Sequence, residues 1–584
     1  MCGIAGYIGD DPNRISEMTD MLAHRGPDHG AYIAFPPFYL GHRLLAIRGV
    51  PARSIQPVTR DNSPWVLVFN GQIYNTDELH RQYGIEKNEL DTTMLFDLIE
   101  RTGWEFIKAI QGMFSIALFN TREQEMRLYR DETGQKPLYY RKGVSDFSFA
   151  SELKALTKPT DTADGVGLTL AAALGYIPGT HTLSAQIRKV APGTYIRVTK
   201  RGTLSIHPFV SNTVVTFDST RDAITKTIRA HVQSKAQVAL NLSGGLDSSI
   251  LLHEMCSAGV TPRTYSTFFE DAGESFNDDA ILARRLALEY GTLHTEITVT
   301  KTAYLHNLIR SYEILEEPNY NISLPAYLLT AEQEGIHGDK NRVVFSGNGG
   351  DEVFGGYPYY AQSLRYTMLM RRIPPFAFNW YKRMRTGMYW NYVDPAERWL
   401  SFKWFAFSAL PVNQNVVRGE FKTILENLAF SDPVRDMMQI DRRVWLPAEN
   451  FLQTDKLYMS QSLEMRAPFS YIPLRRYFDE HLSTEDYISG SGNKRLLRNL
   501  YRGVLPDYIT MRQKKTGWRA PVRPWYDDTY KALFLAILES APRGGLIDWN
   551  RVSRSVQTAP GWPGKYVFLY LSLAVLSKKY GLIL

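Results

Sequence analysis

The 584-residue chain contains only two cysteines, Cys2 and Cys256. Two cysteines cannot build a disulfide scaffold or a Cys-x-x-Cys metal site, and their scarcity is typical of a reducing compartment. Cys256 lies in the apolar segment ILLHEMCSAG and is expected to be a small buried hydrophobic residue. Cys2 follows the initiator methionine directly, and this position needs its own explanation.

The chain also lacks a dense basic block and a long hydrophobic run. Its net charge of +7 is small for 584 residues, which favours a solvated, mildly basic surface over a nucleic-acid footprint. The longest apolar run, YVFLYLSLAVL, is too short to span a bilayer, and no basic-then-apolar leader precedes Cys2. We therefore expect a cytoplasmic protein with small-molecule substrates and with no nucleic-acid or membrane partner.

The length exceeds what one hydrophobic core supports, so at least two domains are expected. Short alternating runs such as WVLVFNGQIYN and GTYIRVTKRGTLSIHPF indicate sheet-forming strands in the first part of the chain. Helical patterns dominate after the polar segment SNTVVTFDSTRDAI. We predict one domain over residues 1–210 and a second over residues 211–584.

Removal of Met1 would make Cys2 the N-terminal residue and a candidate nucleophile. The thiol of Cys2 would then stand beside a free α-amine, whose pKa near 8 suits a general base. Turn-rich segments HRGPD, NGQIYN and RDETGQKPLYY supply polar groups, and Asn70 with the Gly71 backbone N–H could form an oxyanion hole. An accidental N-terminal cysteine and ordinary tight turns are the alternative interpretation.

Two glycine-rich loops in the second part each follow an apolar strand. SGGLDSS follows QVALNL and opens a helix, a context that suits phosphate binding by backbone N–H groups, although no Walker A pattern is present. This loop resembles the pyrophosphatase loop of enzymes that cleave ATP between the α- and β-phosphates. SGNGGDEVFGGY follows RVVF. Asp247 and Asp351 would be the carboxylates that hold Mg²⁺, with helix capping as the alternative role. Lys494 and either Lys514 or Lys515 would face pyrophosphate, unless they are ordinary surface lysines.

The first domain resembles the glutaminase domain of class II amidotransferases, which are N-terminal-nucleophile hydrolases. The matching segments are MCGIAGYIG, HRGPD, NGQIYN, GMFSIALFN, RDETGQKPLYY and FASELKAL. The resemblance implies an α+β sandwich in αββα layers and glutamine hydrolysis at Cys2. Asp91 matches the acid that holds the α-ammonium group of glutamine. Leu44 replaces an arginine and Gln72 replaces a glutamate, and Arg43 or Arg48 is the proposed substitute for the missing cation.

The second domain resembles the synthetase domain of glutamine-hydrolysing asparagine synthetases. SGGLDSS, SGNGGDEVFGGY, SLEMRAPF, NKRLLR and KKTGW carry this resemblance. It implies an α/β ATP-pyrophosphatase domain with a parallel sheet and a helical C-terminal part, ATP and Mg²⁺ as cofactors, and Lys494 as the catalytic lysine. The implied ATP-binding residues are Leu242, Ser243, Gly244, Gly245, Asp247, Ser248, Ser249, Ser346 and Gly347. Asn348 and Gly349 mark the acceptor and nucleophile region, where the family has an acid in place of Asn348, and EEPNYNISLPAYLL resembles the family's acceptor-binding stretch.

The two resemblances together imply an ATP-dependent amidotransferase. Ammonia released at Cys2 would pass through an internal channel to an acyl-adenylate, with aspartate as the default acceptor and asparagine, AMP and pyrophosphate as products. Three alternatives stay open: another carboxylate acceptor, an ammonia-dependent synthetase with a vestigial glutaminase, and a non-catalytic nucleotide-binding regulator. Homodimers are common among such enzymes, so a homodimer is a further expectation.

Overall fold

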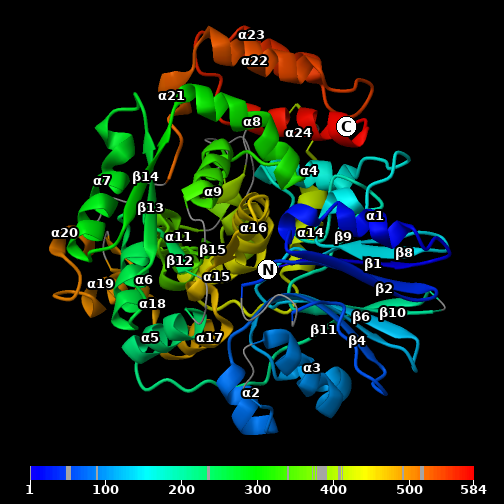
Figure 1. Ribbon diagram of the computed structural model, residues 1–584. Helices are drawn as coiled ribbons and strands as arrows, with labels where there is room; N and C mark the ends of the chain where they lie inside the picture. Colours follow the sequence, from blue (N-terminus) through cyan, green and yellow to red (C-terminus); the bar gives the residue numbers. More distant parts are fainter. Residues whose placement is uncertain are drawn as a thin grey trace.

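The computed structural model in Figure 1 describes most of the chain. It covers residues 2–584 apart from 48–53, 87–89, 201, 233–236, 338–340, 371, 375, 378–379, 381–390, 405–408, 411, 490–491 and 513–517.

Two antiparallel sheets form the N-terminal part of the described chain. The strands of the first sheet are, in spatial order, β2 (His29–Phe35), β3 (Phe38–Leu44), β1 (Cys2–Ile8), β8 (Phe147–Ala150), β7 (Tyr139–Lys142) and β9 (Ile187–Lys189). Those of the second are β11 (Leu204–Pro208), β10 (Thr194–Thr199), β6 (Glu125–Arg130), β5 (Gly112–Asn120) and β4 (Trp65–Ile73).

The two sheets pack face to face, because their strands are apolar on the inner side. Ile4 and Leu40 of the first sheet share one buried core with Val68 and Phe119 of the second. Helix α1 (Arg14–Asp20) covers the outer face of the first sheet, and α2 (Thr76–Tyr83) and α3 (Asp91–Thr102) cover that of the second. The predicted αββα sandwich is confirmed.

A parallel sheet organises the second part. Its strands, in spatial order, are β14 (His294–Val299), β13 (Arg263–Phe269), β12 (Gln237–Asn241), β15 (Asn341–Phe345) and β16 (Glu464–Arg466). Helices α5 (Thr220–His231), α6 (Leu246–Ser257) and α7 (Glu274–Glu289) pack on one face, and α9 (Leu324–His337) and α16 (Phe451–Met459) pack on the other. The predicted α/β arrangement with a parallel sheet is confirmed.

The order of these strands reverses between β12 and β15. The chain runs outward from β12 through β13 to β14, and β15 then returns to the opposite side of β12. Ligands of open parallel sheets bind at the carboxyl ends of the strands at such a switch point. The loops that leave β12 and β15 are SGGLDSS and SGNGGD, so the fold brings the two predicted phosphate loops together.

Helices make up most of the remaining chain, as predicted. Helix α8 (Lys301–Leu315) packs with α22 (Asp528–Glu539), α23 (Trp549–Gln557) and α24 (Tyr566–Tyr580) at the top of Figure 1. Helix α4 (Gly165–Leu174) of the N-terminal part enters the same core. A boundary between residues 210 and 211 stays a prediction, because the two parts share this core.

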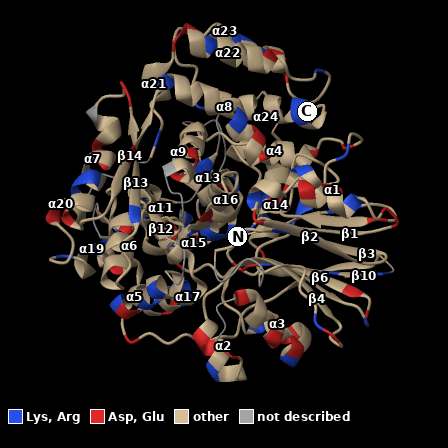
Figure 2. Ribbon diagram, viewed as in Figure 1, with Lys and Arg blue, Asp and Glu red and all other residues tan. Residues whose placement is uncertain are grey.

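Charged residues of both signs alternate on the outer helices. In the ribbon of Figure 2, positions of basic residues (blue) and acidic residues (red) both occur along α5 and α7. On α5, for example, Lys226 pairs with Asp222 at 2.8 Å. The described helices include none that is both long and apolar enough to cross a membrane. The apolar run YVFLYLSLAVL lies in α24, where its residues are buried.

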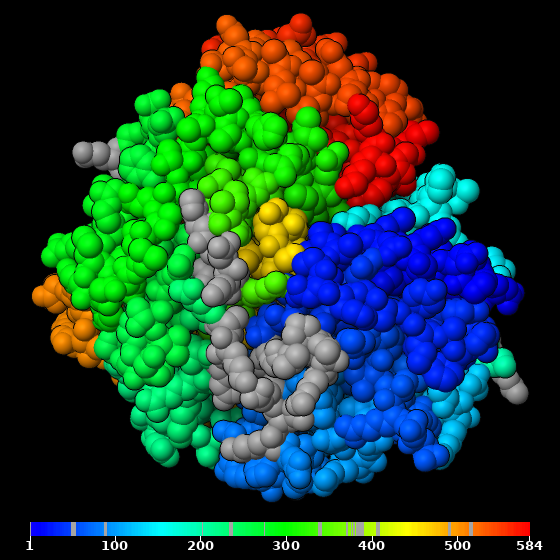
Figure 3. All heavy atoms as spheres, viewed as in Figure 1, coloured from blue at the N-terminus to red at the C-terminus, as the bar shows by residue number. Residues whose placement is uncertain are grey.

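In the space-filling view the N-terminal part, in blue, meets the parallel-sheet part, in green, along a seam (Figure 3). Atoms of the yellow segment, the region of α16, are visible within that seam.

Candidate active sites

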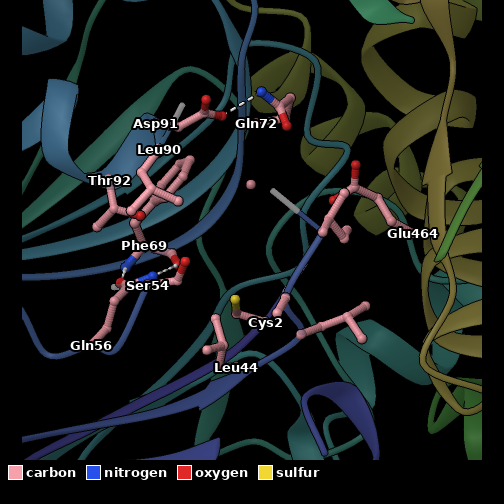
Figure 4. A pocket seen from close by; sticks show the side chains of 14 residues that line it. Cys2, Leu44, Ser54, Gln56, Phe69, Gln72, Leu90, Asp91, Thr92 and Glu464 are labelled. Atoms are coloured by element: carbon pink, nitrogen blue, oxygen red, sulfur yellow. Dashed lines mark hydrogen bonds between the residues drawn. The ribbon is translucent and has the colours of Figure 1, made fainter. Parts of the chain in front are cut away.

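Cys2 begins strand β1, where its partner across the sheet is Leu44 of β3. The backbone nitrogen of Cys2 donates a hydrogen bond of 2.9 Å to Oδ1 of Asn70, which lies on β4 of the facing sheet. The side chain of Cys2 lines a small cavity between the sheets, and Figure 4 shows its sulfur directed toward the opposite wall. Contacts from both sheets therefore fix the position of Cys2.

The thiol of Cys2 is neutral in this setting. Burial raises its pKa, and a hydrogen bond from the Leu45 backbone N–H opposes this effect only in part. A buried neutral thiol needs a nearby base to become a nucleophile. The predicted base is the α-amine that Cys2 carries after removal of Met1, a residue outside the described part of the chain.

Asn70 is hydrogen-bonded to the Cys2 backbone and is followed by Gly71, and the oxyanion-hole role of this pair stays a prediction. Asn70 is fully buried, and its Nδ2 has no hydrogen-bond partner among the described residues. A buried amide donor without a partner is costly unless a ligand uses it. Gly71 lines the cavity, and a Cβ at this position would lie 2.1 Å from the backbone oxygen of Met113, so only glycine permits this approach of β4 and β5.

Gln72 and Asp91, the predicted glutamine-binding residues, also line the cavity. Figure 4 shows them together on the wall across from Cys2. Nε2 of Gln72 donates to the Asp91 carboxylate, and the Ile73 backbone N–H donates to Asp91 Oδ2 at 3.0 Å. The cavity measures about 60 Å³, room for roughly four or five water-sized groups, which suits the side chain of one small molecule.

The prediction that Arg43 substitutes for the missing cation is wrong. Arg43 follows the pleat of β3 to the face opposite Leu44, because neighbouring residues of a strand point to opposite sides. Its guanidinium binds the Thr19 backbone oxygen at 3.1 Å and the Asp20 carboxylate. Leu44 lines the cavity instead. Arg48, the other nearby arginine, lies outside the described residues.

Glu464 is a site residue that the sequence did not reveal. It comes from β16 of the second part, yet it lines the cavity of Cys2. Burial acts to raise its pKa, but nearby positive charges, Arg466 among them, outweigh burial and lower it to about 2. The wall of the thiol cavity therefore carries a permanent negative charge from the other part of the chain. The motif SLEMRAPF contains Glu464, but nothing in its pattern indicates this location.

The first phosphate loop joins β12 to α6. Gly244 adopts a φ of +63°, and a Cβ there would lie 2.7 Å from the Asp279 backbone oxygen, so glycine is required. Ser243 and Ser248 bridge the loop through their hydroxyl groups at 3.1 Å. The twelve-residue helix α6 begins at Leu246, within the SGGLDSS segment, and directs its N-terminal dipole at this position.

The second loop follows β15, and both loops line one cavity of about 410 Å³. Nine of the predicted residues that line it belong to the loops: Leu242, Ser243, Gly244, Gly245, Asp247, Ser248, Ser346, Gly347 and Asn348. Asp351 and Lys494 line it as well. Two predicted residues do not: the Ser249 hydroxyl bonds back to the Gly245 oxygen at 2.8 Å, and Gly349 packs against Ser470.

Lys494 joins the two predicted metal-binding carboxylates. Its ammonium group lies 2.6 Å from Asp351 Oδ1 and also binds Asp247. Burial disfavours the charged lysine, but the two aspartates more than offset it and raise its pKa. Lys494 also has a left-handed backbone, with φ of +56°, a strain that is common at functional sites.

The residues present fit Mg²⁺. Asp247 and Asp351 direct oxygen ligands at one cationic position, which the Lys494 ammonium marks. The described residues contain no cluster of three or more potential metal ligands. Mg²⁺ typically takes one or two carboxylates and completes its coordination with substrate phosphates and water, so this pair suffices only when a phosphate ligand is bound.

The 410 Å³ cavity is also lined by Asn321 and Tyr327 of EEPNYNISLPAYLL, by Trp518 of KKTGW, and by Glu449, a residue that the sequence analysis did not assign. Glu449 is buried there, which raises its pKa to about 7, although a hydrogen bond from Asn321 acts in the opposite direction. The rings of Tyr327 and Trp518 lie 4.0 Å apart on the cavity wall. Asn348 Nδ2, at the loop, has no partner among the described residues. This part of the cavity offers an acid, amides and aromatic faces to a ligand.

Comparison with known proteins gives a family match for each part of the chain. The model of the family described as asparagine synthase matches residues 219–570, and that of the glutamine amidotransferase domain matches residues 1–210. Asparagine synthetase [glutamine-hydrolyzing] 1 of Bacillus subtilis is 26% identical over 90% of this chain and 88% of its own length. Asparagine synthetase B of Escherichia coli is 27% identical over 62% of this chain and 65% of its own.

Among solved structures, glutamine phosphoribosylpyrophosphate amidotransferase from B. subtilis aligns with 51% of this chain and 81% of its own. The TM-score is 0.29 and the sequence identity 16%.

Proposed function

The chain belongs to the asparagine synthase family, and from this premise we propose that it is a glutamine-hydrolysing, AMP-forming carbon–nitrogen ligase. We assign glutamine hydrolysis to residues 1–210 and amide synthesis to residues 211–584. One observation carries the proposal: strand β16 lines both cavities, with Glu464 at the thiol cavity and Met465 at the nucleotide cavity. Neighbouring residues of one strand therefore separate the two sites, which suits transfer of a small molecule between them.

In the first half-reaction the α-amine of Cys2 takes the thiol proton, and the sulfur attacks the amide carbon of glutamine. Asn70 Nδ2 and the Gly71 N–H stabilise the oxyanion that forms. The amine returns its proton to the leaving nitrogen, and ammonia departs. Water then cleaves the thioester and releases glutamate, which restores the thiol. Asp91 holds the α-ammonium group of glutamine during these steps.

In the second half-reaction the Ser243–Ser248 and Ser346–Gly347 loops hold the phosphates of ATP. An oxygen of the acceptor carboxylate attacks the α-phosphorus, pyrophosphate leaves, and ammonia then displaces AMP from the acyl carbon. Lys494 stabilises the charge that develops on the phosphates. Asp247 and Asp351 would hold Mg²⁺, which neutralises pyrophosphate when it is bound. Aspartate is the first acceptor to test, with asparagine as its product.

The test supplies ATP, Mg²⁺ and aspartate with either amide-¹⁵N-labelled glutamine or ammonium. We expect AMP, pyrophosphate and an amide that carries the label. The Cys2→Ala variant is expected to lose glutamine use by at least about 10³-fold, because the nucleophile is absent, and to retain ammonium use. If aspartate yields no AMP with either nitrogen source, the acceptor assignment fails, and other carboxylates are screened by the same AMP readout.

A second candidate function, synthesis from ammonium alone, is favoured by Leu44 and by the outward position of Arg43. The described wall of the thiol cavity carries no cation for the α-carboxylate of glutamine. A buried charged contact of this kind is worth about 1.5–3 kcal/mol, so its loss would weaken glutamine binding by about tenfold or more. Amide formation from ammonium without any glutamate release from glutamine would establish this candidate.

A further inference from the structure

One stretch of the second part carries positive charge with no opposing charge. Residues 353–393 contain neither aspartate nor glutamate, although these acids make up 60 of the 584 residues of the chain. Six basic residues lie in the same stretch: Arg365, Arg371, Arg372, Lys382, Arg383 and Arg385. Both signs of charge occur along α5 and α7, so this stretch differs from those outer helices in the partner that it can attract.

Helix α11 (Pro358–Met370), within this stretch, has a buried face and an exposed face. Tyr360 is fully buried in the core of the second part. Arg365, Met368 and Leu369 are exposed, and positions three and four residues apart share one face of a helix. Met368 and Leu369 are 55% and 41% exposed. The outer face of α11 thus presents apolar side chains beside a guanidinium group.

Exposed apolar residues continue beyond the end of α11. Phe376 and Trp380 are 75% and 64% exposed, and Ile373 is 36% exposed. Arg372, which is also exposed, lies seven positions after Arg365 and therefore near the same helical face. Several large apolar side chains exposed so close together are uncommon on a protein surface unless they bind a partner.

The combination of residues selects among the possible partners. Tryptophan and phenylalanine beside arginine are typical of segments that lie at the boundary between lipid and water. A second copy of the chain is disfavoured, because a twofold interface would place the same arginines opposite one another. A nucleic acid would pair with the arginines but would leave Leu369 and Phe376 in water. The expectation of no membrane partner rested on the lack of a spanning run, which a surface segment does not need.

We propose that this face docks the protein on an anionic membrane surface. The docking face consists of Arg365, Met368, Leu369, Arg372, Ile373, Phe376 and Trp380. Its apolar side chains enter the boundary between headgroups and acyl chains, and its two arginines pair with lipid phosphates. Helix α11 starts directly after Tyr357, which lines the nucleotide cavity, and its thirteen residues span roughly 20 Å. One short helix therefore connects the docking face to the second site.

The experiment measures flotation of the full chain with lipid vesicles. One set of vesicles is phosphatidylcholine alone, and the other contains about 30% phosphatidylglycerol, which gives the surface a negative potential. We expect the chain to partition into the anionic vesicles at least about tenfold more strongly than into the neutral ones. Raising the NaCl concentration from about 0.1 M to about 0.5 M is expected to weaken this binding, because salt screens the arginines.

The double variant Phe376→Ser with Trp380→Ser removes the apolar contribution. We expect its partitioning into anionic vesicles to fall at least about tenfold, since two aromatic side chains no longer leave water. Leu288→Ser with Leu293→Ser is the matched control. These leucines, at the end of α7 and just after it, are 75% and 62% exposed, and their loss is expected to leave vesicle binding unchanged.

The double variant Arg365→Gln with Arg372→Gln removes the electrostatic contribution. Each arginine near an anionic surface strengthens binding about fivefold, so we expect a loss of at least about tenfold. Lys142→Gln with Lys200→Gln removes the same charge from exposed positions of the N-terminal part. This control is expected to stay within about twofold of the unmodified chain, which separates the docking face from the net charge of the protein.

Failure of the unmodified chain to float with anionic vesicles would overturn the inference, as would equal binding by the aromatic variant and its leucine control. Light scattering tests the other occupant: a dimer that the aromatic variant converts to a monomer would make this face an interface between copies, and the membrane proposal would be wrong. Thermal unfolding checks that each variant folds, and the arginine variant gives the second measurement if the aromatic one does not. Flotation uses no substrate, so its failure leaves the proposed function untouched.

Discussion

At the scale of single residues, the oxygen and the nitrogen of the Asn70 side-chain amide have different roles. Oδ1 accepts from the Cys2 nitrogen, and Nδ2 has no partner among the described residues. Asn70→Asp keeps the acceptor and removes the donor. We expect kcat for glutamine hydrolysis to fall by about 10²–10³-fold, the usual cost of losing one oxyanion-hole donor, with KM changed much less. Steady-state glutamate release measures both constants.

Asn75→Asp is the matched control for this variant. Asn75 is buried in the same segment, but its amide holds the backbone of Ala109 and Gln111, at 2.8 and 2.7 Å. Loss of the bond to Ala109 costs about 1–3 kcal/mol of stability, and kcat is expected to stay within about threefold. An equal loss of kcat in both variants would contradict an oxyanion role for Asn70.

Glu334 makes the stability of the protein depend on pH. Burial raises its pKa to about 8, and a hydrogen bond from the Tyr458 hydroxyl at 3.2 Å opposes this only partly. Between its ordinary value of 4.5 and 8, the folded state keeps a proton that the unfolded state releases. Stability therefore falls as pH rises through this window, by on the order of 1.4 kcal/mol per pH unit.

Glu334→Gln removes this contribution, because the amide does not titrate. We expect its unfolding temperature to vary less between pH 5 and pH 8 than that of the unmodified protein. Glu332→Gln, on the same helix and paired with Arg310 at 2.7 Å, is the control and should keep the original pH dependence. Identical pH profiles for Glu334→Gln and the unmodified protein would refute the assignment.

Sequence patterns identified the site residues that belong to local motifs. They failed where the direction of a side chain depends on its position along a strand. Cys2, Gly71, Gln72 and Asp91 were all predicted, and the structure brings them to one cavity. Arg43 was wrong because it lies one position from Leu44, and a single step along a strand reverses the side-chain direction. Nothing in the sequence around Arg43 and Leu44 indicates which of these two side chains faces the cavity.

At the scale of elements, the strand–glycine–helix unit at the first phosphate loop makes a sharp prediction. Gly244→Ala introduces a Cβ 2.7 Å from the Asp279 oxygen and from Leu282 Cβ, at a φ of +63°. The loop must shift to relieve this contact, so we expect ATP to bind at least about tenfold more weakly and the protein to lose about 1–3 kcal/mol of stability. Calorimetry and thermal unfolding measure the two effects.

Gly259→Ala separates backbone strain from steric overlap. Gly259 follows the other end of α6 and has a similar φ of +80°, but a Cβ there meets nothing within 4 Å. It is expected to cost about 1 kcal/mol through strain alone and to leave ATP affinity unchanged. If both variants weakened ATP binding equally, the geometry of the Gly244 loop could not be the cause.

The two loops were predictable because each is a contiguous pattern that follows an apolar strand. At the far end of the nucleotide cavity, Asn321 and Trp518 lie in EEPNYNISLPAYLL and KKTGW, which carried the resemblance, whereas Glu449 was not predicted. The sequence does not show that these residues meet, because their segments lie some seventy to two hundred residues apart. Their proximity follows from tertiary packing, because Asn321 precedes α9, Glu449 precedes α16 and Trp518 belongs to neither helix. Such packing depends on tertiary contacts that no local periodicity encodes.

At the scale of the whole molecule, a buried ionic network connects the two parts. Arg25, from the HRGPD motif, is fully buried and binds Glu152 at 3.0 Å and Asp455 of α16 at 2.9 Å. Its Nε also donates to the Cys2 backbone oxygen at 3.2 Å. The sequence predicted both layered folds, but it placed Arg25 in a binding turn. The structure instead makes Arg25 a support for Cys2 that reaches across the seam.

Asp455→Ala tests how strongly this network joins the parts. Asp455 is nearly inaccessible and also accepts from Lys136 at 3.3 Å, so its removal leaves two buried cations short of a partner. Breaking a buried pair in this way costs about 3–5 kcal/mol, and we expect a lower unfolding temperature. Because Arg25 holds Cys2 while α16 lines the nucleotide cavity, glutamate release and ATP binding should both weaken.

Asp20→Ala provides the control, since Asp20 pairs with Arg43 at the surface and its side chain is 66% exposed. Exposed pairs contribute about 0–1 kcal/mol, so neither activity nor unfolding temperature should change appreciably. If Asp455→Ala, like Asp20→Ala, changed neither activity nor unfolding temperature, the ionic network could not be what holds the two parts of the chain in position. The shared hydrophobic core of α4 and the C-terminal helices would then be the dominant link.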